Sequence, residues 1–244
     1  MNEQVNKLIN TVIENDYCIG CGICASLEGS PFEMKLNEDG KYIPVIKDNP
    51  LDLDLKDKLT PLCPFSDDAK NETEIGKELY SDTSTGFDKY SGYYIKNYAG
   101  YEKESDYRKR GSSGGVGSWS AAQLLENNLV DGILHVKSND KGIDPLFKYD
   151  VSFDVDELKQ GAKSKYYPVE MSEVIDFVRN NDGIYALIGI PCFVKSIRLL
   201  SQNDSIIKER IKYTIGLVCG HLKSEFFAKS IAWEMGIEPE HLQE

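Results

Sequence analysis

Residues 184–201, with the sequence IYALIGIPCFVKSIRLLS, decide the fold class of this chain. Residues 184–190 are almost entirely apolar, which predicts a strand buried on both faces, and Phe193 to Ser201 follows at once as a predicted helix. The pattern recurs where a predicted strand at 211–218, IKYTIGLV, precedes a predicted helix at 224–235. Strands of this kind need helices on both faces of their sheet. The sequence therefore predicts an α/β domain with a mostly parallel or mixed sheet.

The same alternation extends upstream. Residues 130–136, VDGILHV, form a predicted strand, and residues 169–180 form a predicted helix. Before them, a predicted strand at 93–102, YYIKNYAGYE, leads into a loop and then into a helix that begins near Val116. We therefore place the α/β domain at residues 91–244.

The N-terminal quarter of the chain carries a cysteine motif. Cys18, Cys21 and Cys24 lie at two-residue gaps in CIGCGIC, and Cys63, with a proline after it, follows 39 residues later. Three thiolates at this spacing converge on one small centre, and a distant Cys-Pro supplies the fourth ligand of a [4Fe-4S] cluster. The two glycines between them allow the positive φ that such a loop needs. The motif therefore predicts a [4Fe-4S] cluster on these four cysteines.

Other uses of the four cysteines stay open. Four thiolates also form a closed structural zinc site, although zinc ribbons usually separate two Cys-x2-Cys pairs. The remaining alternatives are a disulfide or thiols that bind nothing.

Two short predicted strands follow the motif. Residues 32–36 and 41–46 flank a turn of Asn, Glu, Asp and Gly, which predicts a hairpin that returns the chain towards Cys63. Apolar residues at helical spacing predict an amphipathic helix at 4–15. Together these features predict an α+β, ferredoxin-like [4Fe-4S] module. We assign it, with a polar surface connector at 66–90, to residues 1–90.

Composition argues against several classes of function. The chain has 244 residues, and its 40 acidic and 28 basic side chains give a net charge of -12, which disfavours nucleic-acid binding. No apolar run approaches the ~18 residues of a membrane helix, and the N-terminus lacks the apolar core of a signal peptide. Cysteines at cluster spacing fit a reducing compartment. We therefore expect a cytoplasmic protein.

Two further features occur where ligands of α/β sheets bind. Cys192 and Cys219 each come just past the carboxyl end of a predicted strand, so they are either core residues or one reactive or cluster-binding site. The run RGSSGGVGSW at 110–119 places small residues at a loop-to-helix junction, where backbone N–H groups can bind the pyrophosphate of a nucleotide cofactor. The same run is also typical of a flexible loop and lacks the spaced GxGxxG pattern.

The motifs CIGCGIC, LCPFS, RGSSGGV, VDGILHV, SKYYP, IGIPC and IGLVCG, in this order, resemble the beta-subunit family of coenzyme F420 hydrogenases and dehydrogenases. Its bacterial and plant relatives include ferredoxin-linked reductases such as 7-hydroxymethyl chlorophyll a reductase. The resemblance runs from Cys18 to about Ile237. It implies an iron–sulfur flavoprotein that binds FAD and passes electrons between a cluster and a flavin or a deazaflavin.

The resemblance also implies roles for particular residues. Lys165 and Tyr166 would lie near the flavin, and Cys192 and Cys219 would be ligands of a second [4Fe-4S] cluster. Family members usually supply further cysteines downstream, whereas none follows Cys219 here. Either the chain is truncated, or the second site is lost or completed by other groups, of which His221 is the nearest. The residues implied to cradle the FAD phosphates are Ser112, Ser113, Gly114, Gly115 and Val116.

Three functions follow from these expectations. The first is an oxidoreductase that passes electrons between the cluster and FAD, with a ferredoxin or an 8-hydroxy-5-deazaflavin coenzyme as redox partner. The second is a non-catalytic electron-transfer subunit of a larger hydrogenase or dehydrogenase complex with a partner redox subunit. The third is a zinc-stabilised interaction protein without a redox role. The first two need the same cofactors, so the sequence does not separate them, and it identifies no catalytic residue or small-molecule substrate.

Overall fold

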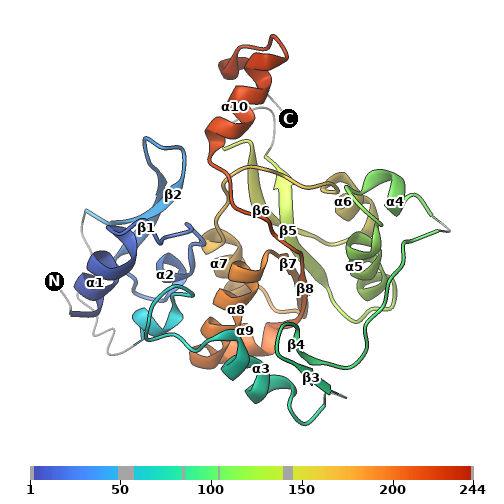
Figure 1. Cartoon of the computed structure of the whole chain (residues 1–244), viewed down its shortest axis with the longest axis horizontal. Helices are drawn as coiled ribbons and strands as arrows, with labels where there is room; N and C mark the ends of the chain where they lie inside the picture. The colour runs from blue at the N-terminus through green and yellow to red at the C-terminus, as the bar shows by residue number, and fades with distance from the viewer. Residues whose placement is uncertain (1–2, 49–57, 84–85, 104, 140–144, 243–244) are drawn as a thin grey trace.

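The computed structural model describes residues 3–48, 58–83, 86–103, 105–139 and 145–242. Within these residues the largest sheet has four strands in the order β6-β5-β7-β8 (Figure 1). The strands are β5 (Gly132–Ser138), β6 (Phe147–Ser152), β7 (Tyr185–Gly189) and β8 (Ile211–Gly216). β5, β7 and β8 run parallel, and β6 pairs antiparallel with β5 at one edge. The sheet is therefore mixed, within the range that the sequence predicts.

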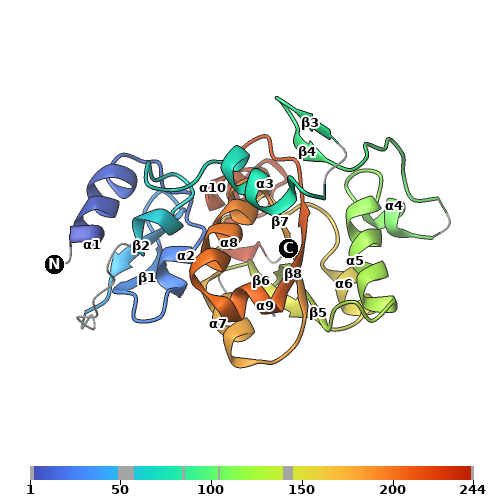
Figure 2. The same ribbon diagram turned by 90° about the horizontal axis from the view of Figure 1, so that it is seen from below.

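Helices cover both faces of this sheet (Figure 2). Ile133 and Ala186 point to one face, whereas their neighbours Leu134 and Leu187 belong to the apolar core on the other. This is why β5 and β7 are apolar at successive positions. The first face carries α5 (Val116–Glu126) and α6 (Val155–Gln160), and the second carries α7 (Ser172–Asn180), α8 (Pro191–Asn203) and α9 (Ser205–Arg210).

The N-terminal part packs against α7 and α8. Its elements are α1 (Glu3–Leu8), the π-helical turn η1 (Ile9–Ile13), α2 (Ile23–Ser26), β1 (Phe32–Leu36), β2 (Tyr42–Ile46) and the short 3-10 helix η2 (Thr60–Leu62). β1 and β2 form the predicted antiparallel hairpin, with Phe32 opposite Ile46. Ile23 and Leu62 are fully buried in the same core as α7 and α8. The cysteine loop is therefore built onto the helical layer of the sheet.

The segment before α5 contains a helix that the sequence does not predict and a shorter strand than expected. The expected connector contains the helix α3 (Glu72–Tyr80), which begins with a capping box between Asn71 and Glu74. Residues 84–85 of that connector lie outside the described residues. The strand expected at 93–102 shortens to β4 (Gly92–Tyr94), which pairs only with β3 (Gly86–Asp88). Aromatic residues favour strands, but a strand also needs a paired strand beside it, and the described residues from Ile95 to Glu102 belong to no sheet.

The remaining elements are α4 (Tyr107–Arg110), α10 (Glu225–Glu234) and the 3-10 helix η4 (Pro239–His241). α10 projects from the body of the molecule in Figure 1. Trp233 and Met235 near its end are 70% and 73% exposed. None of the described helices has both the length and the apolar character needed to cross a membrane.

Candidate functional site

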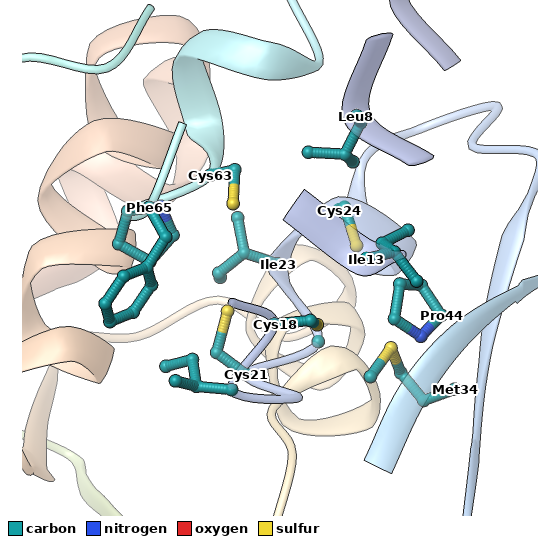
Figure 3. Close-up of a pocket in the computed structure, with 13 residues that line it drawn as sticks. Leu8, Ile13, Cys18, Cys21, Ile23, Cys24, Met34, Pro44, Cys63 and Phe65 are labelled. Carbon is teal, nitrogen blue, oxygen red and sulfur yellow. The ribbon is translucent and has the colours of Figure 1, made fainter. Parts of the chain in front are cut away.

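The four cysteines of the N-terminal motif line a single pocket (Figure 3). Cys18, Cys21 and Cys24 come from the loop before and within α2, and Cys63 comes from the end of η2. Cys21 is buried, and the other three are partly exposed. The remaining lining side chains are uncharged and almost all apolar, among them Leu8, Ile13, Met34, Pro44 and Phe65.

Two glycines shape the loop that carries three of these thiols. Gly20 and Gly22 have φ values of +67° and +83°, a region that only glycine adopts easily. A Cβ on Gly20 would collide with the backbone of Tyr42, and one on Gly22 would collide with Glu170. The Gly20 N–H donates to Cys18 Sγ at 3.4 Å. The loop is therefore held between β2 and the start of α7, with a backbone donor directed at a thiol.

Burial dominates the electrostatics of the pocket. It raises the pKa of Cys63 to about 11 and the pKa of Cys18 above its ordinary value. Burial raises the pKa values of Cys21 and Cys24 further, and the charges of the neighbouring thiolates add to both shifts. Four thiolates in an apolar pocket thus require a bound cationic group to compensate their charge.

The donor set fits an iron–sulfur cluster or zinc. Four soft sulfur ligands, without a carboxylate in the lining, are typical of both groups. In the part of the chain that the structure describes, no three His, Cys, Asp or Glu side chains are grouped to hold a metal ion. A cubane cluster takes one thiolate at each iron, so its four ligands surround a group and do not meet at one ion.

Cys192 and Cys219 follow the ends of two neighbouring strands at equivalent positions. Gly189 at the end of β7 pairs with Gly216 at the end of β8, and the Leu217 N–H donates to the Gly189 carbonyl at 2.9 Å. Each cysteine follows its paired glycine by three residues. The two cysteines therefore leave the same edge of the sheet from parallel, adjacent strands.

The charge of Cys192 interacts with Cys219 and also with Cys21 in the four-cysteine pocket. Burial, with the charge of Cys219 as a smaller cause, raises the pKa of Cys192. The charge of Cys192 in turn contributes to the raised pKa of Cys21. His221 is exposed. Cys192 thus lies close enough to Cys219 and to Cys21 for their charges to interact.

The small-residue loop before α5 is held by its own backbone contacts. Gly115 precedes α5 with a φ of +78°, and a Cβ there would collide with the backbone of Tyr107 and Arg108. The Gly114 carbonyl accepts a hydrogen bond from the Glu102 N–H at 2.9 Å. Gly115 is therefore required for packing against Tyr107 and Arg108, whatever else the loop binds.

The structure brings this loop next to the other residues implied for a flavin. The Ser164 N–H donates to Ser112 Oγ at 2.9 Å, although the two residues are 52 positions apart. Lys165 follows directly, with its ammonium 4.9 Å from the centre of the Phe147 ring. Tyr166 is 60% exposed, and Ser113 and Val116 are also exposed. Ser112 thus contacts the residue before Lys165, while the Lys165 ammonium lies over Phe147 and the Tyr166 ring packs edge-on against Phe227.

The start of α5 also reaches the carboxyl edge of the sheet. Gly117 lies against Leu217, the residue after β8, because a Cβ on Gly117 would be 3.7 Å from that leucine side chain. Open α/β sheets bind their ligands at this edge. The loop before α5 and the segment beyond β8 therefore border one region.

Lys195 is a charged residue near the pocket that sequence reasoning does not identify. It lies in α8, three residues after Cys192, and its ammonium is 3.2 Å from Glu72 Oε1. Its positive charge lowers the pKa of Cys63, although burial outweighs this effect. The spacing from Cys192 was the only signal in the sequence.

Two family models match the chain, and both describe the beta subunit of coenzyme F420 hydrogenase/dehydrogenase. Residues 97–176 match the model of the N-terminal part of this subunit, and residues 182–244 match the model of its C-terminal part. No curated protein sequence matches.

A solved structure is also similar. It is a chain from the xenon-derivatized F420-reducing [NiFe] hydrogenase complex of Methanosarcina barkeri, with a TM-score of 0.51 and 18% sequence identity. The alignment covers 60% of this chain and 51% of that chain, so the present chain spans about half of its length. At this identity the similarity concerns the fold alone.

Proposed function

This chain belongs to the coenzyme F420 hydrogenase/dehydrogenase beta-subunit family, and we propose that it transfers electrons between a [4Fe-4S] cluster and FAD. The cluster is held by Cys18, Cys21, Cys24 and Cys63. The observation that carries the proposal is that these four cysteines, from two separate segments, line one apolar pocket. The family is one of oxidoreductase subunits, which agrees with such a role.

The residues of the pocket would act on the cluster in two ways. The four thiolates bind it, and the side chains of Leu8, Ile13 and Met34 exclude water from its surroundings. Backbone N–H groups of the loop, such as that of Gly20, donate towards sulfur. A bound cluster supplies one electron at a time, and a flavin exchanges one or two.

We place the flavin at the loop before α5. The Ser164–Ser112 hydrogen bond joins this loop to the segment that carries Lys165, whose positive charge would favour a phosphate. Exposed Ser113 can donate a hydrogen bond to the same ligand. An anionic deazaflavin coenzyme or a ferredoxin is then the redox partner.

Anaerobic purification with metal, sulfide and flavin analysis tests the assignment. The expected result is about four iron and four sulfide per chain, together with bound FAD or uptake of added FAD. Stoichiometric zinc without sulfide would instead favour the zinc-stabilised interaction protein. An iron–sulfur protein that takes up no flavin would leave the cluster assignment standing and refute the flavin assignment.

A second candidate function is a non-catalytic role within a larger redox complex. The exposure of Trp233 and Met235 near the end of α10 favours it, because large apolar side chains grouped at a surface are typical of contacts between proteins. A turnover assay separates the two candidates. The cofactor-loaded chain, given a reduced viologen, should reduce a deazaflavin by itself if it is an enzyme, and it should need a partner redox protein otherwise.

A further inference from the structure

Lys195 is held in a partly buried position in α8. It lies one turn after Cys192 in α8, and residues three apart share a helix face. Its side chain is only 13% exposed, whereas that of its ion-pair partner Glu72 is 76% exposed. The ammonium is therefore in a low-dielectric environment, while the carboxylate is largely screened by water.

α8 places this ammonium beside the four-cysteine pocket. The helix packs against η2, the turn that leads directly into Cys63. Glu72, the ion-pair partner of Lys195, begins α3 nine residues after Cys63, so the ion pair joins α8 to the segment that follows this ligand. In agreement with this placement, the positive charge of Lys195 lowers the pKa of the Cys63 thiol, although burial outweighs it. Apart from the thiols themselves, the described residues that line the pocket have no charged side chain. Lys195 is thus a cation next to an otherwise uncharged lining.

The negative charge of the cluster determines how the Lys195 ammonium affects its reduction. A cubane with four thiolate ligands is an anion, and reduction adds one more negative charge. A nearby positive charge therefore stabilises the reduced cluster more than the oxidised cluster. Glu72 opposes this effect, but water screens its charge more strongly.

We propose that Lys195 raises the reduction potential of the cluster bound by Cys18, Cys21, Cys24 and Cys63. The proposal rests on the proposed function, because it assumes a cluster at these four residues. Lys195 acts as a tuning residue: it binds neither the cluster nor a substrate, and its charge sets how readily the pocket accepts an electron.

The test is an anaerobic redox titration of the cluster followed by EPR. In Lys195→Met the equilibrium constant for reduction should fall about tenfold, which is about 59 mV for a one-electron couple. Lys195→Arg keeps the charge and should stay close to the parent. Glu72→Gln removes the opposing charge and should move the potential in the positive direction by less. Lys208→Met, at an exposed position in α9, is the matched control and should leave the potential unchanged.

An unchanged potential in Lys195→Met with full iron content would overturn the proposal. If Lys195→Met loses its cluster, the reduction potential of Glu72→Gln decides the question, because Glu72 is at the surface. A shift of that potential in the negative direction contradicts the electrostatic argument. Iron and sulfide analysis of the parent separates this inference from the proposed function. A parent without sulfide refutes the cluster itself, whereas a parent with a full cluster and insensitive variants refutes only the role of Lys195.

Discussion

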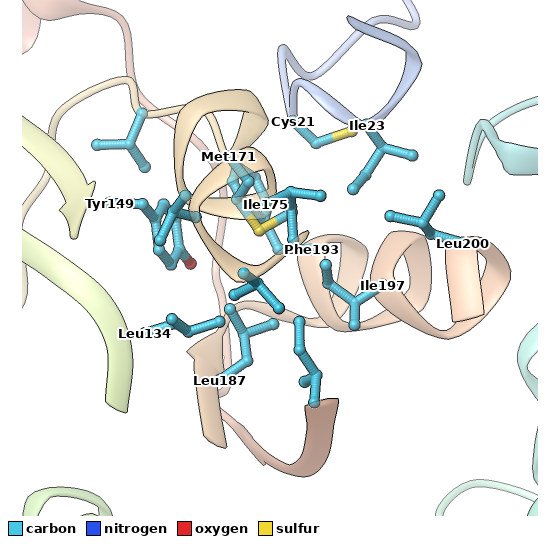
Figure 4. Close-up of a cluster of buried hydrophobic side chains, with 14 of the residues drawn as sticks. Cys21, Ile23, Leu134, Tyr149, Met171, Ile175, Leu187, Phe193, Ile197 and Leu200 are labelled. Carbon is cyan, nitrogen blue, oxygen red and sulfur yellow. The ribbon is translucent and has the colours of Figure 1, made fainter. Parts of the chain in front are cut away.

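The Met171 N–H donates a hydrogen bond to the Cys21 carbonyl oxygen at 3.0 Å, which joins the cysteine loop to the start of α7. Figure 4 shows the consequence for packing: Cys21 and Ile23 lie beside Ile175 and Phe193 in one apolar cluster. The loop that presents three thiols is therefore continuous with the core of the sheet. Changes at the loop should affect cofactor content and stability together.

The cysteine ligands give the most direct prediction. Replacing Cys24 or Cys63 with Ser should remove most of the iron and sulfide, because a cubane loses one of its four ligands. The measurement is iron and sulfide content with the absorbance near 400 nm, about where iron–sulfur chromophores absorb. Cys219→Ser, outside the pocket, should retain the cluster. Equal iron in all three variants would exclude the assigned ligand set.

Gly22 should be harder to replace than a glycine of similar φ in open surroundings. Gly22→Ala combines a positive φ, which costs an L-residue about 1–2 kcal/mol, with a collision against Glu170. Gly92 has a φ of +75° with nothing near its missing Cβ, so Gly92→Ala carries the conformational cost alone. We expect Gly22→Ala to lower the free energy of unfolding more than Gly92→Ala and to reduce iron uptake. Equal losses in chemical denaturation would mean that the contact with α7 contributes nothing.

Replacing Ser112 should weaken flavin binding more than replacing its neighbour Ser113. Ser112→Ala removes the acceptor of the Ser164 N–H, and a hydrogen bond of this kind contributes about 0.5–1.5 kcal/mol. The position of Lys165 then loosens, so the affinity for FAD should fall about two- to tenfold. Fluorescence titration with FAD measures this affinity, and circular dichroism checks that the variant is folded. Matching affinities in Ser112→Ala and the parent would place the flavin elsewhere.

His135 should make the stability of the protein depend on pH. Burial lowers its pKa to about 4 from an ordinary value of 6.5, and the ring bonds to Ser152 Oγ at 2.8 Å. Between these values the unfolded chain binds a proton that the folded chain does not, so stability falls as the pH falls from 6.5 towards 4. The loss between pH 7 and pH 5 should be about 2 kcal/mol.

His135→Gln isolates this contribution, since glutamine does not titrate. Its free energy of unfolding should be lower than that of the parent at pH 7 but should change less between pH 7 and pH 5. Other groups titrate equally in both proteins, so the difference between the two curves belongs to His135. Parallel curves would show that the imidazole is protonated equally in the folded and unfolded chains.

Several elements were predictable from local sequence. The apolar run before Pro191 predicts β7 and the helix after it, and proline at the first helical position fits the observed start of α8. The hairpin β1–β2 follows from two strands around a turn of Asn, Asp and Gly. The spacing of Cys18, Cys21 and Cys24 was enough to mark the pocket that they line. Each of these signals lies within about twenty residues, where periodicity and turn chemistry act.

Other elements depended on distant partners. β6 is an edge strand with alternating polar residues, and it was missed because only its pairing with β5 makes it a strand. The segment after Tyr94 has strand-forming residues but no strand beside it among the described residues. Strand formation depends on a neighbouring backbone, which a single stretch of sequence does not specify.

The sequence by itself determined the four-cysteine motif, the strand–helix alternation and the positions of Cys192 and Cys219 after their strands. Only the tertiary structure decided that Lys195 pairs with Glu72 and that Ser112 bonds to Ser164. Contacts of this kind join residues more than 50 positions apart, and they arise when helices pack on a sheet at angles that local propensity leaves free. The residues that carry the proposed chemistry are therefore visible in the sequence, whereas the groups that tune them depend on the packing of the fold.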